Sequence, residues 1–267
     1  MAVKTGMSLK RYFLFDLVRS IVRWFLVGVV TFILFFPILF AFLVLFLFDR
    51  DRKQIHPLIS IWAKAVLIVC PLMNVRLEGT HHLKPNATYV LVTNHQSISD
   101  IIAVLHLSHP FKFIAKRDLF WIPFFGWGLW LAGYIPLIRG NQKSGKEVIQ
   151  KANGYLKRGV SVLFFPEGTR SRDGEIQAFK VGAFKISSEL GIPVVPIVIH
   201  GTRDLIPKGS RLLQRRVEVI VKIEAPQQPF GKNNGSIDQF CEKVRSDMIG
   251  SLHEIRSRVR PIETVLV

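Results

Sequence analysis

A histidine and an aspartate stand five residues apart in the segment NHQSISD, which occupies residues 94–100 and follows a short apolar run. Histidine is the side chain best suited to take a proton from a hydroxyl near neutral pH. A carboxylate on its other ring nitrogen stabilises the imidazolium that forms. On one straight helix, His95 and Asp100 would point in different directions. Across a corner from strand to loop to helix, the chain can bring Asp100 back to His95, so the segment is a candidate general-base pair.

The same segment also has a purely structural interpretation. Ser97-Ile98-Ser99-Asp100 is typical of a helix N-terminus, with a serine as cap and an acid in the first turn, where the helix dipole stabilises negative charge. Asp100 can serve both purposes. The spacing alone therefore leaves the catalytic and the capping interpretations open.

The segment FPEGTRS, residues 165–171, also follows a predicted strand. Gly168 permits close backbone approach or an unusual φ angle, and Arg170 can grip a phosphate with its bidentate fork. Glu167 can accept hydrogen bonds from hydroxyl groups. The alternative is an ordinary turn with a surface ion pair.

Two weaker segments belong to the same part of the chain. GYIPLIR, residues 133–139, reads as a strand that ends in Arg139, which is either a second phosphate ligand or a solvated strand end. VPIVI, residues 195–199, reads as a buried strand, and alone it indicates only core packing.

Together, the four segments resemble the lysophosphatidic acid (1-acyl-glycerol-3-phosphate) acyltransferase family of phospholipid synthesis. That family has four ordered blocks, of which the first is an N-H-x-x-x-x-D (HxxxxD) box. Pro136 departs from the pattern, because the second block often has an aromatic residue there. The resemblance implies that His95 is the base and Asp100 its partner. It also implies a set of substrate-binding residues for the glycerol phosphate: Lys116, Arg139, Glu167, Gly168, Thr169 and Arg170.

The reaction that the resemblance implies is transfer of a fatty acyl group to the 2-hydroxyl of lysophosphatidic acid, which gives phosphatidic acid. The donor would be acyl-CoA or acyl carrier protein as co-substrate, with no cofactor and no metal. Another lysophospholipid or glycerol-3-phosphate is an alternative acceptor. A basic membrane scaffold that binds anionic lipid is a non-enzymatic alternative, but it gives no reason for His95 and Asp100 to accompany two arginines.

The pattern of apolar runs predicts an α/β fold with a mixed, largely parallel central sheet flanked by helices. Near-continuous apolar strands are typical of a sheet that is buried on both faces. The predicted strands cover residues 87–93, 111–115, 134–138, 160–165, 194–199 and 217–223. The predicted helices cover residues 100–107, 146–156, 179–190 and 237–255.

The N-terminal region predicts a membrane anchor. Residues 24–48 carry no charge and would extend about 37 Å as a helix, enough to cross a bilayer core. Basic residues flank this run on both sides, and Pro37 would bend or break it. Two helices that dip into one leaflet and one tilted span therefore both remain open. Residues 55–72 predict an interfacial helix beside the anchor. We thus expect membrane-anchoring helices in 1–72 and a glycerolipid acyltransferase α/β domain in 73–267.

The formal net charge of +17 is compatible with nucleic acid, anionic lipid headgroups, or an acidic substrate or carrier as partner. The absence of an RNA-binding or zinc-finger signature and the presence of a membrane segment favour the last two, so no nucleic acid is expected. Cys70 and Cys241 form no C-x-x-C pair. Reduced thiols, and hence an active domain that faces the cytoplasm, are expected. A bacterial inner membrane is favoured over an organellar membrane.

Three other signatures are incomplete. Residues 140–146 fit G-x-x-x-x-G-K, but Glu147 stands where a phosphate-binding loop needs Ser or Thr. Ser97 lies outside any G-x-S-x-G elbow, which argues against a serine hydrolase. The histidines at 81, 82, 106 and 109 lack a zinc-binding frame, so no metal is predicted.

Overall fold

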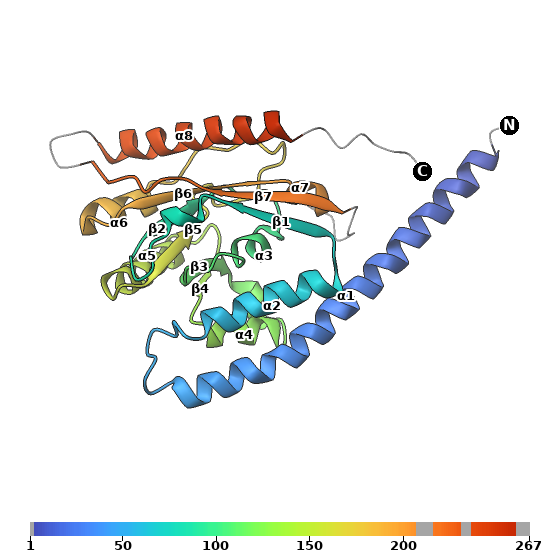
Figure 1. Ribbon diagram of the computed structural model, residues 1–267, viewed down its shortest axis with the longest axis horizontal. Helices are drawn as coiled ribbons and strands as arrows, with labels where there is room; N and C mark the ends of the chain where they lie inside the picture. Colours follow the sequence, from blue (N-terminus) through green and yellow to red (C-terminus); the bar gives the residue numbers. More distant parts are fainter. Residues whose placement is uncertain (1–2, 207–215, 231–235, 260–267) are drawn as a thin grey trace.

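The computed structural model describes residues 3–206, 216–230 and 236–259 of the chain (Figure 1). At its centre lies a seven-stranded sheet in the order β1-β7-β6-β2-β5-β3-β4. Its strands are β1 (Met73–Glu78), β2 (Val90–Thr93), β3 (Phe111–Lys116), β4 (Ile135–Leu137), β5 (Ser161–Phe164), β6 (Val194–His200) and β7 (Val217–Ile223). Neighbouring strands are parallel except β6 and β7, which confirms the predicted mixed, largely parallel sheet.

Helices cover both faces of this sheet, as Figure 1 shows. Every residue of β2 and β5 is buried, as near-continuous apolar strands require. The helices are α1 (Val3–Leu45), α2 (His56–Val69), α3 (Asp100–Val104), α4 (Phe125–Leu131), α5 (Gln142–Lys157), α6 (Gly182–Leu190), α7 (Thr202–Leu205) and α8 (Ile237–Arg258), with 3-10 turns η1 (Thr80–His82) and η2 (Arg117–Trp121). One apolar core lies under α2, α3 and α4, and a second under α5, α6 and α8.

The structure adds elements that the sequence pattern did not predict. Strand β1 pairs in parallel with β7 at the edge of the sheet, and only Met73 of its six residues is buried. Its apolar signal is weak for that reason. The segment that contains η2 and α4 is too short and too uniformly apolar to show a helical period. Helix α5 begins at Gln142 rather than at residue 146, because the Asn141 side chain accepts a hydrogen bond from the Ser144 amide.

Helix α1 is continuous through Pro37, so the predicted break at this residue does not occur. Proline removes one helical hydrogen bond, but Phe35 and Ile38 are buried beside it, and their packing offsets that loss. The part Leu17–Leu45 is long and apolar enough to cross a membrane and is mostly exposed. Helix α2 returns alongside α1 (Figure 1), which confirms the predicted helix beside the anchor.

The loop between α1 and α2 is held against the α/β domain by a buried lysine. Lys112 on β3 donates hydrogen bonds to the carbonyls of Arg52 and Ala132, at 3.1 and 2.6 Å. Burial lowers the pKa of Lys112 to about 7. Helix α2 also shares its apolar core with the sheet. The division at 72/73 therefore stays a prediction, although β1 begins at Met73.

The parallel arrangement determines where the candidate site residues lie. The carboxyl ends of parallel strands meet at one edge of a sheet, and ligands of such sheets bind outside that edge. His95 follows β2, Lys116 ends β3, Arg139 follows β4 and Glu167 follows β5. Because β6 is parallel to β2, Thr202 also lies at this edge.

Candidate active site

His95 and Asp100 form a hydrogen-bonded pair. The Nδ1 atom of His95 lies 2.7 Å from Oδ2 of Asp100, and the aspartate side chain is fully buried. A carboxylate at Nδ1 stabilises the tautomer with its proton on that nitrogen, which leaves Nε2 as the ring nitrogen that can take a proton. The turn between β2 and α3 makes this contact possible, since α3 begins at Asp100 itself.

The carboxylate of Asp100 is held by the backbone that precedes it. Its Oδ2 atom also accepts hydrogen bonds from the amides of Gln96 and Ser97, at 2.7 and 2.9 Å. The hydroxyl of Thr202, on α7, donates to the other oxygen, Oδ1. Ser99 is the N-cap residue of α3 but makes no capping hydrogen bond with its side chain. The expected serine cap is thus absent at Ser99, and Asp100 itself satisfies the amides of this turn.

The loop that carries His95 is tied to the strands on both sides of β2. Asn94 makes two hydrogen bonds with the backbone of Ile199 on β6, at 2.9 and 2.8 Å. On the side of β5, Glu167 Oε1 accepts from the His95 amide at 2.8 Å, and the Ser171 amide donates to the His95 carbonyl at 2.7 Å. These contacts fix the backbone of His95 from both neighbours.

Glu167 is therefore in contact with the loop that carries His95. Its second oxygen accepts from the Gln177 amide at 3.1 Å, so both carboxylate oxygens are bonded to backbone amides. Burial raises the pKa of Glu167 to about 7, although the amides of His95 and Gln177 act in the opposite direction. Its predicted contact with substrate hydroxyls stays a prediction. The hydrogen bond that Glu167 makes in the structure positions the backbone of His95.

Arg139 and Arg170 lie close enough to influence each other. Partial burial lowers the pKa of Arg139, and the positive charge of Arg170 lowers it further. Arg170 is half-buried and Thr169 beside it is exposed. Lys116, at the end of β3, pairs with Asp118 at 2.5 Å on the exposed surface. The structure thus brings two of the three predicted phosphate-binding cations together, while Lys116 is paired with a neighbouring acid.

Gly168 has a positive φ of 69°, which explains why this position suits glycine. A Cβ atom on Gly168 would stand 2.9 Å from Nζ of Lys180, so the lysine ammonium lies directly against this backbone. The Lys180 amide also donates to the carbonyl of Pro166 at 2.9 Å. Lys180 is a third cation at the loop that carries Arg170.

Comparison with known proteins agrees with this geometry. Residues 74–200 match the family model described as Acyltransferase. The chain is 37% identical over 209 residues to the 1-acyl-sn-glycerol-3-phosphate acyltransferase BAT2, chloroplastic, of Brassica napus, covering 78% of this chain and 59% of that protein. It is 32% identical over 187 residues to the 1-acyl-sn-glycerol-3-phosphate acyltransferase of Saccharomyces cerevisiae, covering 68% of this chain and 61% of that protein.

The fold is also similar to a solved structure, the 1-acyl-sn-glycerophosphate (LPA) acyltransferase PlsC from Thermotoga maritima. The TM-score is 0.75 at 27% sequence identity, and the match covers 92% of this chain and 99% of that one. The chain belongs to the acyltransferase family. It spans about three-fifths of the length of the Brassica relative.

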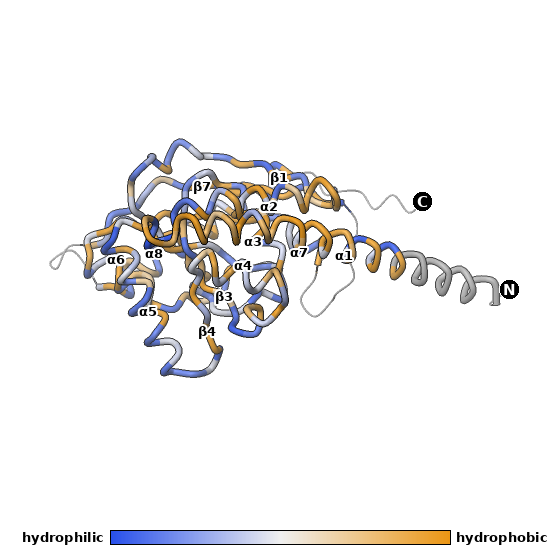
Figure 2. Tube along the Cα trace, turned by 90° about the horizontal axis from the view of Figure 1, so that it is seen from below, coloured by the Kyte–Doolittle hydropathy of each residue, from blue (hydrophilic) through white to orange (hydrophobic). Residues whose placement is uncertain are grey.

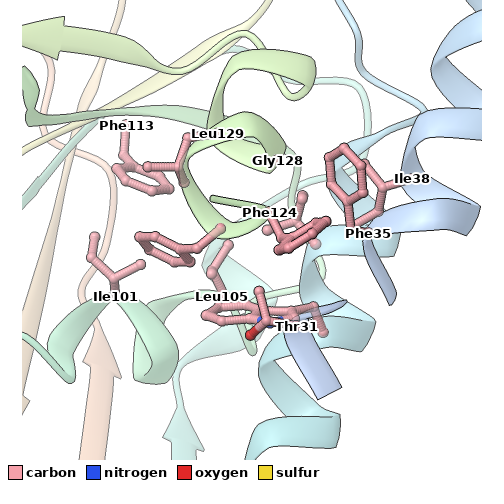
Figure 3. Close-up of a pocket in the computed structure, with 12 residues that line it drawn as sticks. Thr31, Phe35, Ile38, Ile101, Leu105, Phe113, Phe124, Gly128 and Leu129 are labelled. Atoms are coloured by element: carbon pink, nitrogen blue, oxygen red, sulfur yellow. The ribbon is translucent and has the colours of Figure 1, made fainter. Parts of the chain in front are cut away.

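An apolar hollow lies between α1, α3, α4 and β3. Figure 3 shows Phe35 and Ile38 of α1, Ile101 of α3 and Phe113 of β3 around it. The hollow is small, about 30 Å³, and its lining is almost entirely apolar. One of its lining residues, Ile101, directly follows Asp100 in the chain.

Two residues of this site carry no signal in the amino-acid sequence. Thr202 is 102 residues from Asp100, and Lys180 stands in an unremarked stretch before α6. Both lie near the site because they follow β6 and β5, the two strands that flank β2 in the sheet. The only available hint was the position of Thr202, shortly after the segment VPIVI.

Proposed function

We propose that this acyltransferase transfers an acyl group from an acyl thioester to the 2-hydroxyl of lysophosphatidic acid, forming phosphatidic acid. The observation that carries the proposal is the 2.7 Å contact between His95 and the buried Asp100, at the same sheet edge as two arginines. The names of the relatives support this choice of acceptor.

In the proposed mechanism, His95 acts as a general base. As the 2-hydroxyl oxygen attacks the thioester carbonyl carbon, its proton passes to Nε2 of His95, and Asp100 stabilises the imidazolium. The tetrahedral intermediate then collapses, the carbon–sulfur bond breaks, and the imidazolium returns the proton to the leaving thiolate. A thiol has a pKa of about 8.5, so it leaves readily. The step consumes one acyl thioester and releases one thiol.

The phosphate of the acceptor would bind between Arg139 and Arg170. Their mutual repulsion, which contributes to the lowered pKa of Arg139, would be relieved by a bound anion. Guanidinium groups form bidentate hydrogen bonds with phosphate, and Lys180 against Gly168 would add a third positive charge. The apolar hollow beside Ile101 would receive part of a hydrocarbon chain.

The membrane placement is also a proposal. The middle of α1 packs against α4, since the rings of Phe35 on α1 and Trp127 on α4 lie 5.8 Å apart. If α1 stood upright across a bilayer, this contact would draw α4 and the sheet behind it into the hydrocarbon core. We therefore place α1 within one leaflet, on the cytoplasmic side of a bacterial inner membrane. The free thiols of Cys70 and Cys241 support a location on the cytoplasmic side, because the cytoplasm keeps thiols reduced.

An acceptor panel tests the reaction. Membranes that contain the protein would be given one labelled acyl-CoA or acyl carrier protein, together with lysophosphatidic acid, another lysophospholipid or glycerol-3-phosphate. We expect phosphatidic acid from the first acceptor, and its loss in His95→Ala. His106→Ala is the matched control, because His106 is part-buried and its ring bonds the carbonyl of Ile102 in the preceding helix α3. Transfer that survives in His95→Ala would refute His95 as the base, and a wild-type protein that adds no transfer to that of control membranes would favour the non-enzymatic scaffold.

Arg170→Ala tests the phosphate site. Loss of a hydrogen bond to a charged group costs roughly 1.5–3 kcal/mol, so the KM for lysophosphatidic acid should rise roughly tenfold or more. The KM for the thioester should change little. Arg172→Ala, an exposed neighbour, is the control. Equal effects of Arg170→Ala on both substrates would remove Arg170 from phosphate binding.

A further inference from the structure

The segment from Arg117 to Leu131, which holds η2 and α4, exposes large apolar side chains outside the N-terminal anchor. Trp121 is 74% exposed, Trp130 55% and Trp127 45%. Ile122 is 45% exposed in the turn between the two elements. A surface of this size and composition on a folded domain marks a site of interaction with a partner or a membrane.

The turn between η2 and α4 is fixed to the anchor. Phe124 has a positive φ of 62°, a conformation that a bulky side chain rarely adopts. Its ring packs edge-on against Phe32 and Phe35 of α1, at 4.8 and 5.5 Å between centroids. Figure 3 shows Phe124 beside Phe35. The surrounding structure therefore imposes this strained turn, and it holds the segment at the middle of α1.

The exposed face of the segment continues the exposed face of α1. Phe36 and Phe32 of α1 lie 5.1 Å apart, Phe32 lies 4.8 Å from Phe124, and Phe124 lies 5.0 Å from Trp127. Phe32 and Phe36 are 46% and 49% exposed. Figure 2 shows the trace of α1 in the orange of hydrophobic residues along most of its coloured length. The anchor and the segment thus form one apolar surface.

Charged groups lie at the border of this surface. A groove between the segment and α5 is lined by Trp121 and Trp130 together with Arg117, Lys151 and one acid, Glu147. Tryptophan is enriched where hydrocarbon meets headgroups, because its ring is apolar and its N–H is polar. Arginine and lysine beside it attract anionic lipid. A lipid surface matches this combination better than a purely apolar protein partner does.

We propose that η2 and α4 form a second membrane-contacting element, in which Trp121, Trp127 and Trp130 insert at the interface of an anionic phospholipid bilayer. This inference rests on the proposed placement of α1 in one leaflet. It adds that the α/β domain itself enters the membrane surface next to α1, so the acceptor need not leave the lipid to reach the site.

Tryptophan fluorescence in vesicles tests the proposal. The chain has five tryptophans, of which Trp24 lies on α1 and Trp62 is buried in the core. Trp→Phe substitutions yield three forms of the full chain: one that keeps only Trp24, one that keeps only Trp62, and one that keeps only the three tryptophans of the segment. Each is placed in phosphatidylglycerol vesicles with brominated acyl chains, which quench at contact, and then exposed to iodide in the aqueous phase.

We expect brominated lipid to quench the segment tryptophans to the same degree as Trp24 and well above Trp62, with iodide quenching weak. Strong iodide quenching of the segment without bromolipid quenching would overturn the proposal while leaving the anchor intact. Loss of bromolipid quenching at Trp24 as well would overturn the anchor placement and this proposal together. The readout needs no turnover, so a failure of the proposed acyl transfer would be seen separately, in the acceptor panel.

Discussion

Thr202 is a positioning residue whose effect can be worked out from the structure. Its hydroxyl donates to Oδ1 of Asp100, and both residues are fully buried. In Thr202→Val, the side chain keeps its shape, but one oxygen of the carboxylate loses a donor. Hydrogen bonds to charged groups contribute roughly 1.5–3 kcal/mol. In the variant, the Asp100 carboxylate is therefore held less firmly in the position from which it stabilises the imidazolium.

If this energy is expressed in the transition state, kcat falls roughly tenfold to 150-fold in Thr202→Val. The KM for lysophosphatidic acid should change little, because the phosphate site lies on other loops. Initial rates with a labelled acyl thioester, measured over a range of lysophosphatidic acid concentrations, give both quantities.

Thr202→Ser is the matched control, because it keeps the hydroxyl and removes only a methyl group. We expect it to retain most of the activity, whereas a purely structural role for Thr202 would make the two variants similar. Thermal unfolding of both variants in detergent separates a packing defect from a kinetic one. Equal kcat values for the Val and Ser variants would refute the role assigned to the hydroxyl.

Three further outcomes follow from the same site. Burial raises the pKa of Glu167 from its ordinary 4.5 to about 7, so its contribution to stability falls by roughly 3 kcal/mol as the pH rises from below 4.5 to above 7. Glu167→Gln should lose that pH dependence in thermal unfolding, and an unchanged slope would contradict it. Asn94→Leu leaves the backbone N–H and C=O of Ile199 unpaired, so it should lower the free energy of unfolding by roughly 2–5 kcal/mol in denaturant unfolding. A loss under about 1 kcal/mol would argue against the importance of these two hydrogen bonds. Gly168→Ala places a methyl group at positive φ and 2.9 Å from the Lys180 ammonium, so the acceptor KM should rise roughly fivefold, and an unchanged KM would separate this loop from the phosphate.

The fold could be predicted from sequence wherever local pattern and burial agree. The strands that became β2, β5 and β6 are apolar at nearly every position, and the structure buries them on both faces. β1 was not predicted because it lies at the edge of the sheet and buries a single residue, so its sequence lacks a clear apolar pattern. Its place beside β7 follows from a pairing between residues that are far apart in the chain, which no local pattern encodes.

The anchor shows the same division. Its position and length follow from an uncharged run that no soluble strand or loop would have. Whether Pro37 breaks the helix depends on what packs around it, and α2 and α4 supply that packing. The contact of α4 with the middle of α1 is likewise a tertiary fact, and it supports the proposed placement of the anchor within one leaflet.

For the candidate site, the sequence by itself determined which side chains can do the chemistry: a histidine and an aspartate across a strand-to-helix corner, and arginines after two other strands. Residue type and strand order carry that information. Only the tertiary structure decided that Asp100 meets Nδ1 of His95, that Thr202 and two amides hold the carboxylate, and that Glu167 bonds the backbone of His95. A hydrogen bond requires its donor–acceptor distance to be correct to within a few tenths of an ångström. Between distant parts of the chain, such distances arise only once the parallel strands have brought their ends to one edge.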